Sequence, residues 1–179
     1  MIDVGTEALL PDGLRDGLPP DAAHESVVVA RLVGSFGRFG YELVEPPLVE
    51  FEDTLLDGVA ASIANATFRL MDPVSQRMMG VRADMTLQVA RIASTRLVNA
   101  QRPLRLAYAG QVLRVQGSQL RPEREFRQAG VELIGATEAA ADAEVVVLAA
   151  TALADAGVAD ISVDINLPTL VPRLCEGFN

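Results

Sequence analysis

The chain contains no lysine and only one cysteine and one histidine, Cys175 and His24, among its 179 residues. Without lysine it cannot use a Schiff-base lysine, a Walker A lysine or a kinase-type strand lysine. One cysteine and one histidine cannot build a disulfide within the chain, or a Cys/His zinc site short of oligomerisation. Serine-dependent catalysis would need His24, which has no serine elbow near it. The composition therefore excludes the particular sites named here, and we expect no metal and no cofactor.

Long apolar runs are also absent. No stretch of about 18 apolar residues occurs, so we expect no segment that spans a membrane. The first residues are acidic, whereas a secretory signal would be basic. Together with the single cysteine, these features predict a reducing, cytoplasmic location.

Positive charge is scarce except in the middle of the chain. The net charge is −9, but residues 69–127 carry 11 arginines against 4 acidic residues. Residues 1–68 and 128–179 are both strongly acidic. The arginines either balance acidic groups across the folded protein or assemble a site for a small anion. Nucleic-acid binding is unfavoured, because the chain is acidic overall and only 4% of its residues are aromatic and could stack on bases.

Hydrophobic periodicity predicts the helices and strands. Helices are expected from Asp21 to Gly37–Gly40, around Asp53–Val59, and over Met85–Val98, Ala136–Ala156 and Leu167–Asn179. Strands are expected at Tyr41–Val44, Thr67–Met71, Arg77–Val81, Leu104–Tyr108, Gln111–Val115, Phe126–Ile134 and Ile161–Ile165. Asp21 and Asp84 are the expected N-caps of the helices that follow them.

The order of these elements indicates the fold class. The strands come as hairpins and consecutive pairs, with long helices before and after them. This favours an α+β fold, an antiparallel sheet flanked by helices, over a doubly wound parallel sheet. A length of 179 residues suits a single domain, residues 1–179, which opens with an extended segment, residues 1–20, rich in glycine, proline and aspartate.

The junction at residues 82–86 carries an aspartate and a threonine where a strand gives way to a helix. On local grounds Asp84 and Thr86 are most simply capping groups. The alternative is that they offer oxygen acceptors to the ammonium group of a ligand.

The strand near residue 130 has unusual polarity. Phe126, Gln128, Gly130 and Glu132 share one strand face. A buried carboxylate costs several kcal/mol unless it is paired, so the face either borders a polar pocket or is exposed to solvent. In the pocket interpretation the glycine allows a ligand to approach closely, and Arg114 on the adjacent strand could bind a phosphate or carboxylate.

Four segments in order carry a resemblance to a known family: Gly40–Pro47, Arg82–Thr86, Tyr108–Arg114 and Arg124–Gly135. Together they resemble the catalytic domain of class II aminoacyl-tRNA synthetases, specifically its histidyl branch. The first looks like the dimer-forming motif 1, and the last two look like motif 2 and its loop. The resemblance covers roughly residues 10–165 and implies a homodimer formed through the motif 1-like segment.

Within that branch, residues 82–93 look most like the non-catalytic paralogues that serve as regulatory subunits of ATP phosphoribosyltransferase. The synthetase usually has Pro-Glu where this chain has Ala83-Asp84. The resemblance implies a partner, the short-form catalytic subunit, which this chain would activate in the first step of histidine biosynthesis, with feedback by histidine. The alternatives are part of a histidyl-tRNA synthetase, which activates histidine with ATP, and a stand-alone histidine-binding or dimerisation module.

The resemblance also implies roles for single residues. The positions of Asp84, Thr86, Gln128 and Glu132 hold histidine in the synthetase, and that of Arg114 holds the ATP α-phosphate. Arg124, in the same stretch, is the second candidate for anion binding. Gln116 stands where the synthetase typically has a glutamate near the adenine, which is a departure from the nucleotide site.

The end of the sequence departs from the family pattern as well. The chain stops at Asn179, before a motif 3 arginine, the later histidine-specific segment and an anticodon-binding domain. We therefore expect a partial class II synthetase-like domain, truncated at its C-terminus, and no stand-alone aminoacylation.

Overall fold

The computed structural model describes residues 10–58, 61–166, 172–173 and 175. Its helices are α1 (Asp21–Arg38), α2 (Glu52–Leu55), α3 (Ala61–Ala66), α4 (Thr86–Thr95) and α5 (Ala139–Ala156). Its strands are β1 (Glu42–Leu43), β2 (Val49–Phe51), β3 (Arg69–Met71), β4 (Met78–Val81), β5 (Leu104–Leu113) and β6 (Glu125–Ile134). None of the helices in these ranges is long and apolar enough to cross a membrane.

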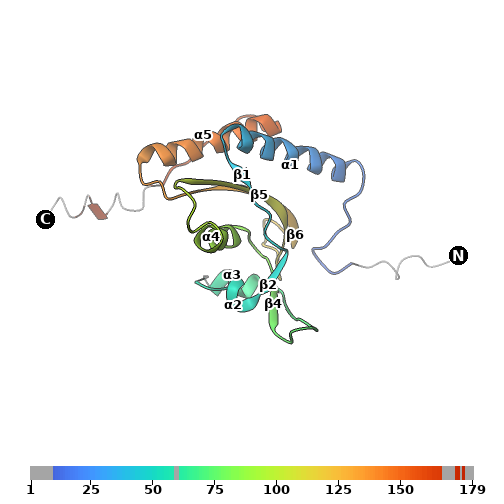
Figure 1. Ribbon diagram of the computed structural model, residues 1–179. Helices are drawn as coiled ribbons and strands as arrows, with labels where there is room; N and C mark the ends of the chain where they lie inside the picture. Colours follow the sequence, from blue (N-terminus) through green and yellow to red (C-terminus); the bar gives the residue numbers. More distant parts are fainter. Residues whose placement is uncertain (1–9, 59–60, 167–171, 174, 176–179) are drawn as a thin grey trace.

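The central sheet has the strand order β1-β5-β6. The ten-residue strands β5 and β6 pair antiparallel over their full length, from Leu104 opposite Ile134 to Leu113 opposite Glu125. The short β1 adds to the other edge of β5 in parallel. Helices α1 and α5 cover one face of this sheet and α4 covers the other (Figure 1). The expected α+β class is confirmed, with one parallel pair in the sheet.

Each face of the sheet has its own hydrophobic core, because side chains alternate along a strand. Even-numbered residues of β5, such as Leu106 and Val112, pack against Met85 and Val89 at the start of α4. Odd-numbered residues face α1 and α5. There Ala107 joins a second cluster with the buried residues Phe36, Tyr41, Leu148 and Ala152.

A second, smaller sheet has the order β2-β4-β3 and lies beyond α4 (Figure 1). Its strands β3 and β4 form the expected antiparallel hairpin, with Met71 opposite Met78. Asp72 stabilises the turn by accepting hydrogen bonds from the backbone N–H groups of Val74 and Ser75, each at 3.1 Å.

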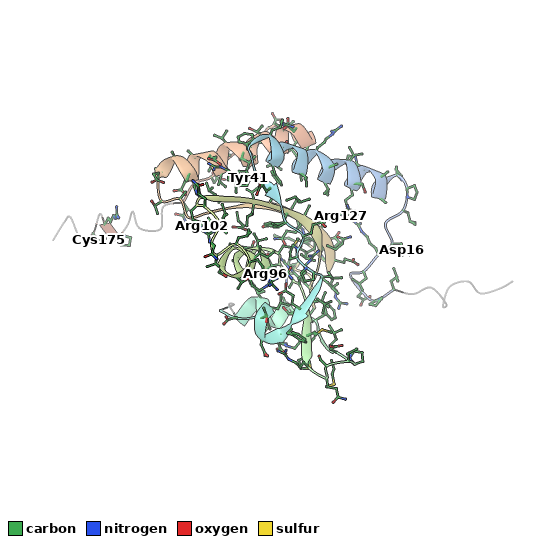
Figure 2. The ribbon with its side chains drawn as sticks, viewed as in Figure 1. Asp16, Tyr41, Arg96, Arg102, Arg127 and Cys175 are labelled. Carbon is green, nitrogen blue, oxygen red and sulfur yellow. The ribbon has the colours of Figure 1, made fainter. Side chains whose placement is uncertain are left out.

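Polar contacts bind α5 to the rest of the molecule. Glu144 accepts two hydrogen bonds of 2.8 Å from Arg105 on β5 and one of 3.1 Å from the hydroxyl of Tyr41. Figure 2 shows Tyr41 beneath the two helices. Asp155 at the other end of α5 pairs with Arg38 at the end of α1. Helix α5 is therefore attached to the sheet near its start and to α1 near its end.

Several predicted elements are confirmed. Helices α1, α4 and α5 follow the predicted periodicity, and Gly157 ends α5 in the left-handed conformation at φ 98°. Glycine suits this position because it carries no Cβ to clash there.

Other predictions are wrong. Residues 161–165 form no strand, because alternation alone does not supply a neighbouring strand to pair with. The two strands predicted at 104–108 and 111–115 are one continuous β5, since Gly110 stays paired with Gln128. The N-caps are Pro20 and Met85, each one residue from the predicted Asp21 and Asp84. The helix predicted at Leu167–Asn179 falls largely outside the described residues.

Candidate functional site

The candidate site lies where the turn before α4 meets the middle of β6. Residues 82–86 leave β4 and run into the first turn of α4, which packs on the even-numbered face of β5 and β6. That face of β6 carries Gln128, Gly130 and Glu132, as strand alternation predicts.

Gln128 and Asp84 lock the turn to the strand. The Gln128 side chain donates from Nε2 to Oδ2 of Asp84 at 3.0 Å and accepts at Oε1 from the Met85 backbone N–H at 2.9 Å. The other Asp84 oxygen, Oδ1, accepts from the Thr86 backbone N–H at 2.8 Å. Asp84 therefore satisfies a helix N-terminal N–H, as a capping group does, and also faces the β6 side chains.

A second chain of polar contacts continues from Thr86. Its Oγ1 shares a hydrogen bond of 3.1 Å with the Tyr108 hydroxyl, which donates to Oε1 of Glu132 at 3.4 Å. Gln128, Asp84, Thr86, Tyr108 and Glu132 thus form one connected cluster. The structure brings together all four residues expected to bind histidine and adds a fifth side chain between them.

Tyr108 is the residue of this cluster that the sequence analysis did not assign. It is 5% exposed and lies directly opposite Gly130 in the β5–β6 register. A Cβ added at Gly130 would lie 2.5 Å from the Tyr108 hydroxyl oxygen. The prediction that Gly130 lets a ligand approach closely is therefore wrong, since the tyrosine ring uses that space. The sequence signal for Tyr108 is a tyrosine that lies opposite a glycine on the neighbouring strand. It can be recognised only once the register of β5 with β6 is known.

Burial sets the electrostatics of the cluster. It raises the pKa of Glu132, because the carboxylate loses contact with water, and the nearby charge of Asp84 acts in the same direction. Burial likewise raises the pKa of Tyr108. Two carboxylates with hydroxyl and amide groups between them favour a cationic or hydrogen-bond-donating ligand such as an ammonium or imidazole group.

Arg114 borders two cavities just beyond β5. One, of about 320 Å³, also has Asp84 in its wall; its lining is Ile63, Ala66, Ala83, Asp84, Arg114, Gln116, Gly117 and Ser118. The other, of about 310 Å³, is lined by Arg114, Gln116, Gly117, Ser118, Leu120, Arg121, Glu123 and Phe126. Arg114 donates from Nε to the Ala83 carbonyl at 3.3 Å and lies over the Phe126 ring. A carboxylate and a guanidinium facing one cavity suit a zwitterionic ligand.

Arg124 has different surroundings. Its guanidinium donates to the carbonyls of Asp12 at 3.0 Å and of Arg114 at 3.3 Å, and it lies over the Phe68 ring. Its backbone N–H donates to the Gly13 carbonyl at 2.8 Å. These contacts hold residues 12–13 against the start of β6. Its anion-binding role stays a prediction.

No group of three or more His, Cys, Asp or Glu side chains within the described ranges could hold a metal ion.

Comparison with known families and proteins gives consistent results. The family model described as Histidyl-tRNA synthetase matches residues 13–179. The chain is 64% identical to the ATP phosphoribosyltransferase regulatory subunit of Rhodospirillum centenum over 172 residues, which are 96% of this chain and 45% of that protein. It is 62% identical to the protein of the same name from Paramagnetospirillum magneticum, over 99% of this chain and 47% of that protein. The chain therefore spans about half the length of these relatives.

Solved structures agree on the fold. The crystal structure of an ATP phosphoribosyltransferase regulatory subunit/histidyl-tRNA synthetase from Bacillus halodurans superposes with a TM-score of 0.75 at 34% identity, covering 87% of this chain and 40% of that one. Apo histidyl-tRNA synthetase from S. aureus superposes with a TM-score of 0.69 at 24% identity, covering 85% of this chain and 35% of that one, and supports the fold alone.

Proposed function

This chain belongs to the histidyl-tRNA synthetase family, and from that premise we propose that it acts within a non-catalytic regulatory subunit of ATP phosphoribosyltransferase. The observation that carries the proposal is its identity of 64% and 62% to relatives with that name, over nearly the whole chain. The proposed partner is the short-form catalytic subunit, which joins ATP to phosphoribosyl pyrophosphate. The proposed location is the cytoplasm.

The proposed ligand is histidine, bound at Asp84, Thr86, Gln128 and Glu132. The contacts of this cluster support the proposal. Its two carboxylates match the ammonium and imidazole groups of histidine, and Arg114, which lines the same cavity as Asp84, matches a carboxylate. Burial penalises the Glu132 charge, and a cationic ligand would relieve that penalty.

Feedback requires that histidine bind two states of the complex with different affinity. In this proposal the ligand links the turn before α4 to β6, because its binding groups come from both. A state of the complex that changes the distance between these two elements would therefore bind histidine differently.

The test is reconstitution of the intact gene product with the short-form catalytic subunit. We expect phosphoribosyl-ATP formation to rise when the two are mixed and to fall when histidine is added. Glu132→Ala should keep the activation and lose the histidine response. A rate that is independent of this protein would reject the regulatory role.

A second candidate is part of a histidyl-tRNA synthetase, favoured by the name of the matching family model and by Arg114 beside the cavity that Asp84 also lines. Histidine-dependent exchange of pyrophosphate into ATP by the intact gene product separates the two. We expect no exchange, and exchange at a rate typical of a synthetase would support the second candidate instead.

We also propose that the motif 1-like segment forms a homodimer. Its apolar residues support this, since Leu43 and the adjacent Leu48 are 49% and 48% exposed. The apolar area of two such leucines would be removed from water in a dimer.

A further inference from the structure

Arg82, two residues before Asp84, is a buried charge with two partners from distant parts of the chain. It is 7% exposed. Its Nε donates to the Gln111 carbonyl on β5 at 2.6 Å, and its Nη1 donates to the Pro46 carbonyl at 2.8 Å, in the linker between β1 and β2. One guanidinium therefore joins the linker to β5.

The backbone of Arg82 repeats this bridge. Its N–H donates to the Leu48 carbonyl of the same linker at 3.0 Å, and its carbonyl accepts from the Leu113 N–H of β5, also at 3.0 Å. Side chain and backbone thus bind the same two elements. The position of residue 82 is fixed from both sides, and so is the start of the turn that follows it.

The strand leaves space for this guanidinium. A Cβ at Gly110 would collide with Nη2 of Arg82, so a larger residue at that position of β5 would require the guanidinium to move. Burial lowers the pKa of Arg82, and the carboxylate of Glu50 opposes that effect. Burying a guanidinium is costly unless hydrogen bonds compensate, which the two carbonyls do.

The turn held in this way carries groups of the candidate site. The next residue, Ala83, accepts from Nε of Arg114, and Asp84 and Arg114 face the same cavity. We propose that Arg82 is a positioning residue: by bridging the carbonyls of Pro46 and Gln111, it sets the distance between the carboxylate of Asp84 and the guanidinium of Arg114. The identity of the ligand, histidine, rests on the function proposed above.

The role needs the shape of arginine and not only its charge. A planar guanidinium can donate in two fixed directions to two carbonyls, whereas a lysine ammonium is a compact point charge on a flexible stem. Arg82→Lys keeps the charge and loses the double bridge. Arg82→Met loses both but keeps a long side chain.

The experiment is calorimetric titration of histidine into the intact gene product and three variants. Arg82→Lys and Arg82→Met should each weaken histidine binding by at least about tenfold, the size of effect known for removing a partner that orients a metal-binding side chain. The matched control is Arg105→Met, which removes two hydrogen bonds from the opposite face of β5. It should change the affinity by less than about twofold, since it touches no group of the site.

Amide hydrogen exchange provides a readout that does not depend on the ligand. The N–H groups of Met85, Thr86 and Leu113 are bonded to Gln128, Asp84 and Arg82 respectively. In Arg82→Lys these three should exchange faster while the amides of α5 keep their protection. A merely structural loss would speed exchange throughout the fold.

The outcomes separate the two proposals. If the wild-type protein gives no heat with histidine, the proposed ligand is rejected, and the exchange pattern alone decides the role of Arg82. Uniform loss of protection overturns that role. Where histidine does bind, wild-type affinity in a folded Arg82→Lys variant overturns it as well, whatever the exchange pattern. If Arg82→Met fails to fold, the affinity and the exchange pattern of Arg82→Lys alone test the role of Arg82.

Discussion

At the scale of single residues, the pair of Tyr108 and Gly130 gives the strongest prediction. Gly130→Ala would place a methyl group 2.5 Å from the Tyr108 hydroxyl oxygen. Because Tyr108 links Thr86 to Glu132, its displacement should weaken the proposed binding of histidine. It should also lower the free energy of unfolding by about 1–3 kcal/mol, as overpacking usually does. Calorimetry and urea denaturation measure the two effects.

The control for that change is Gly34→Ala, the same substitution where a Cβ meets nothing within 4 Å. Gly34 lies inside α1, so alanine should stabilise the protein by about 0.5–1 kcal/mol. If Gly130→Ala matched this control in both stability and affinity, the role assigned to Tyr108 would be wrong.

Glu132 gives a pH-dependent prediction. Because burial raises its folded-state pKa, this group stabilises the fold fully below its ordinary value of 4.5 and loses that contribution as the pH rises through the raised value. Glu132→Gln keeps the uncharged form at all pH values. At neutral pH the variant should therefore be more stable to urea than the wild type. It should also weaken the proposed binding of histidine, because the charge that would face a cationic ligand is lost. In acid the difference in stability should vanish.

The control is Glu125→Gln, at the exposed start of the same strand, which should leave the stability profile unchanged. A neutral-pH stability for Glu132→Gln below that of the wild type would mean that the carboxylate stabilises the fold.

The sequence predicts those parts of the site that depend on neighbouring residues, and it does not predict contacts between residues far apart in the chain. The shared face of Gln128 and Glu132 follows from strand alternation, which is local. The contacts of Tyr108 depend on the register of β5 with β6. Those of Arg82 depend on the linker that contains Pro46, some 36 residues away in sequence. Neither is visible in a single sequence.

At the scale of elements, the attachment of α5 to the sheet can be tested through Glu144. Hydrogen bonds from Arg105 lower the pKa of Glu144, so its stabilisation is present above its unfolded-state pKa and is lost as the pH falls through the lowered value. Glu144→Gln should reduce the midpoint of thermal unfolding at neutral pH, and the gap to the wild type should close in acid. Asp142→Asn, exposed two residues earlier on the same helix, should have a smaller effect.

The accuracy of the element prediction follows a similar rule. Long helices with caps of suitable sequence, such as α5 ending at Gly157, are fixed by local periodicity. Short strands are fixed by their neighbours. The three-residue β2 exists because β4 pairs with it, whereas residues 161–165 alternate equally well and pair with none of the strands in the described part of the chain.

At the scale of the whole molecule, the arginine-rich middle of the chain has a simple explanation. Five of its 11 arginines pair with acidic residues: Arg69, Arg77, Arg91, Arg105 and Arg127. Four others, Arg82, Arg102, Arg114 and Arg124, donate to backbone carbonyls. The first of the two interpretations of the charge pattern, balance across the folded protein, therefore explains the five ion-paired arginines. Of the carbonyl-bound arginines, Arg114 also borders the cavity that Asp84 lines.

The proposed homodimer is a property of the whole molecule and is tested as one. Leu48→Asp should shift the intact gene product towards monomer in analytical ultracentrifugation, since it places a charge at an exposed apolar position next to the motif 1-like segment. Val74→Asp, at a hairpin position that is 91% exposed, is the matched control and should leave the mass unchanged. Equal masses for all three proteins would place the dimer interface elsewhere or exclude it.

The alternation of β5 and β6 also bears on how such a fold can diverge. Even-numbered residues of the two strands face the candidate site, and odd-numbered residues hold α1 and α5. Substitutions can therefore accumulate on one face of the β5–β6 pair without disturbing the packing on the other face. A protein built this way can acquire a new ligand, or give up catalysis altogether, while inheriting its architecture unchanged.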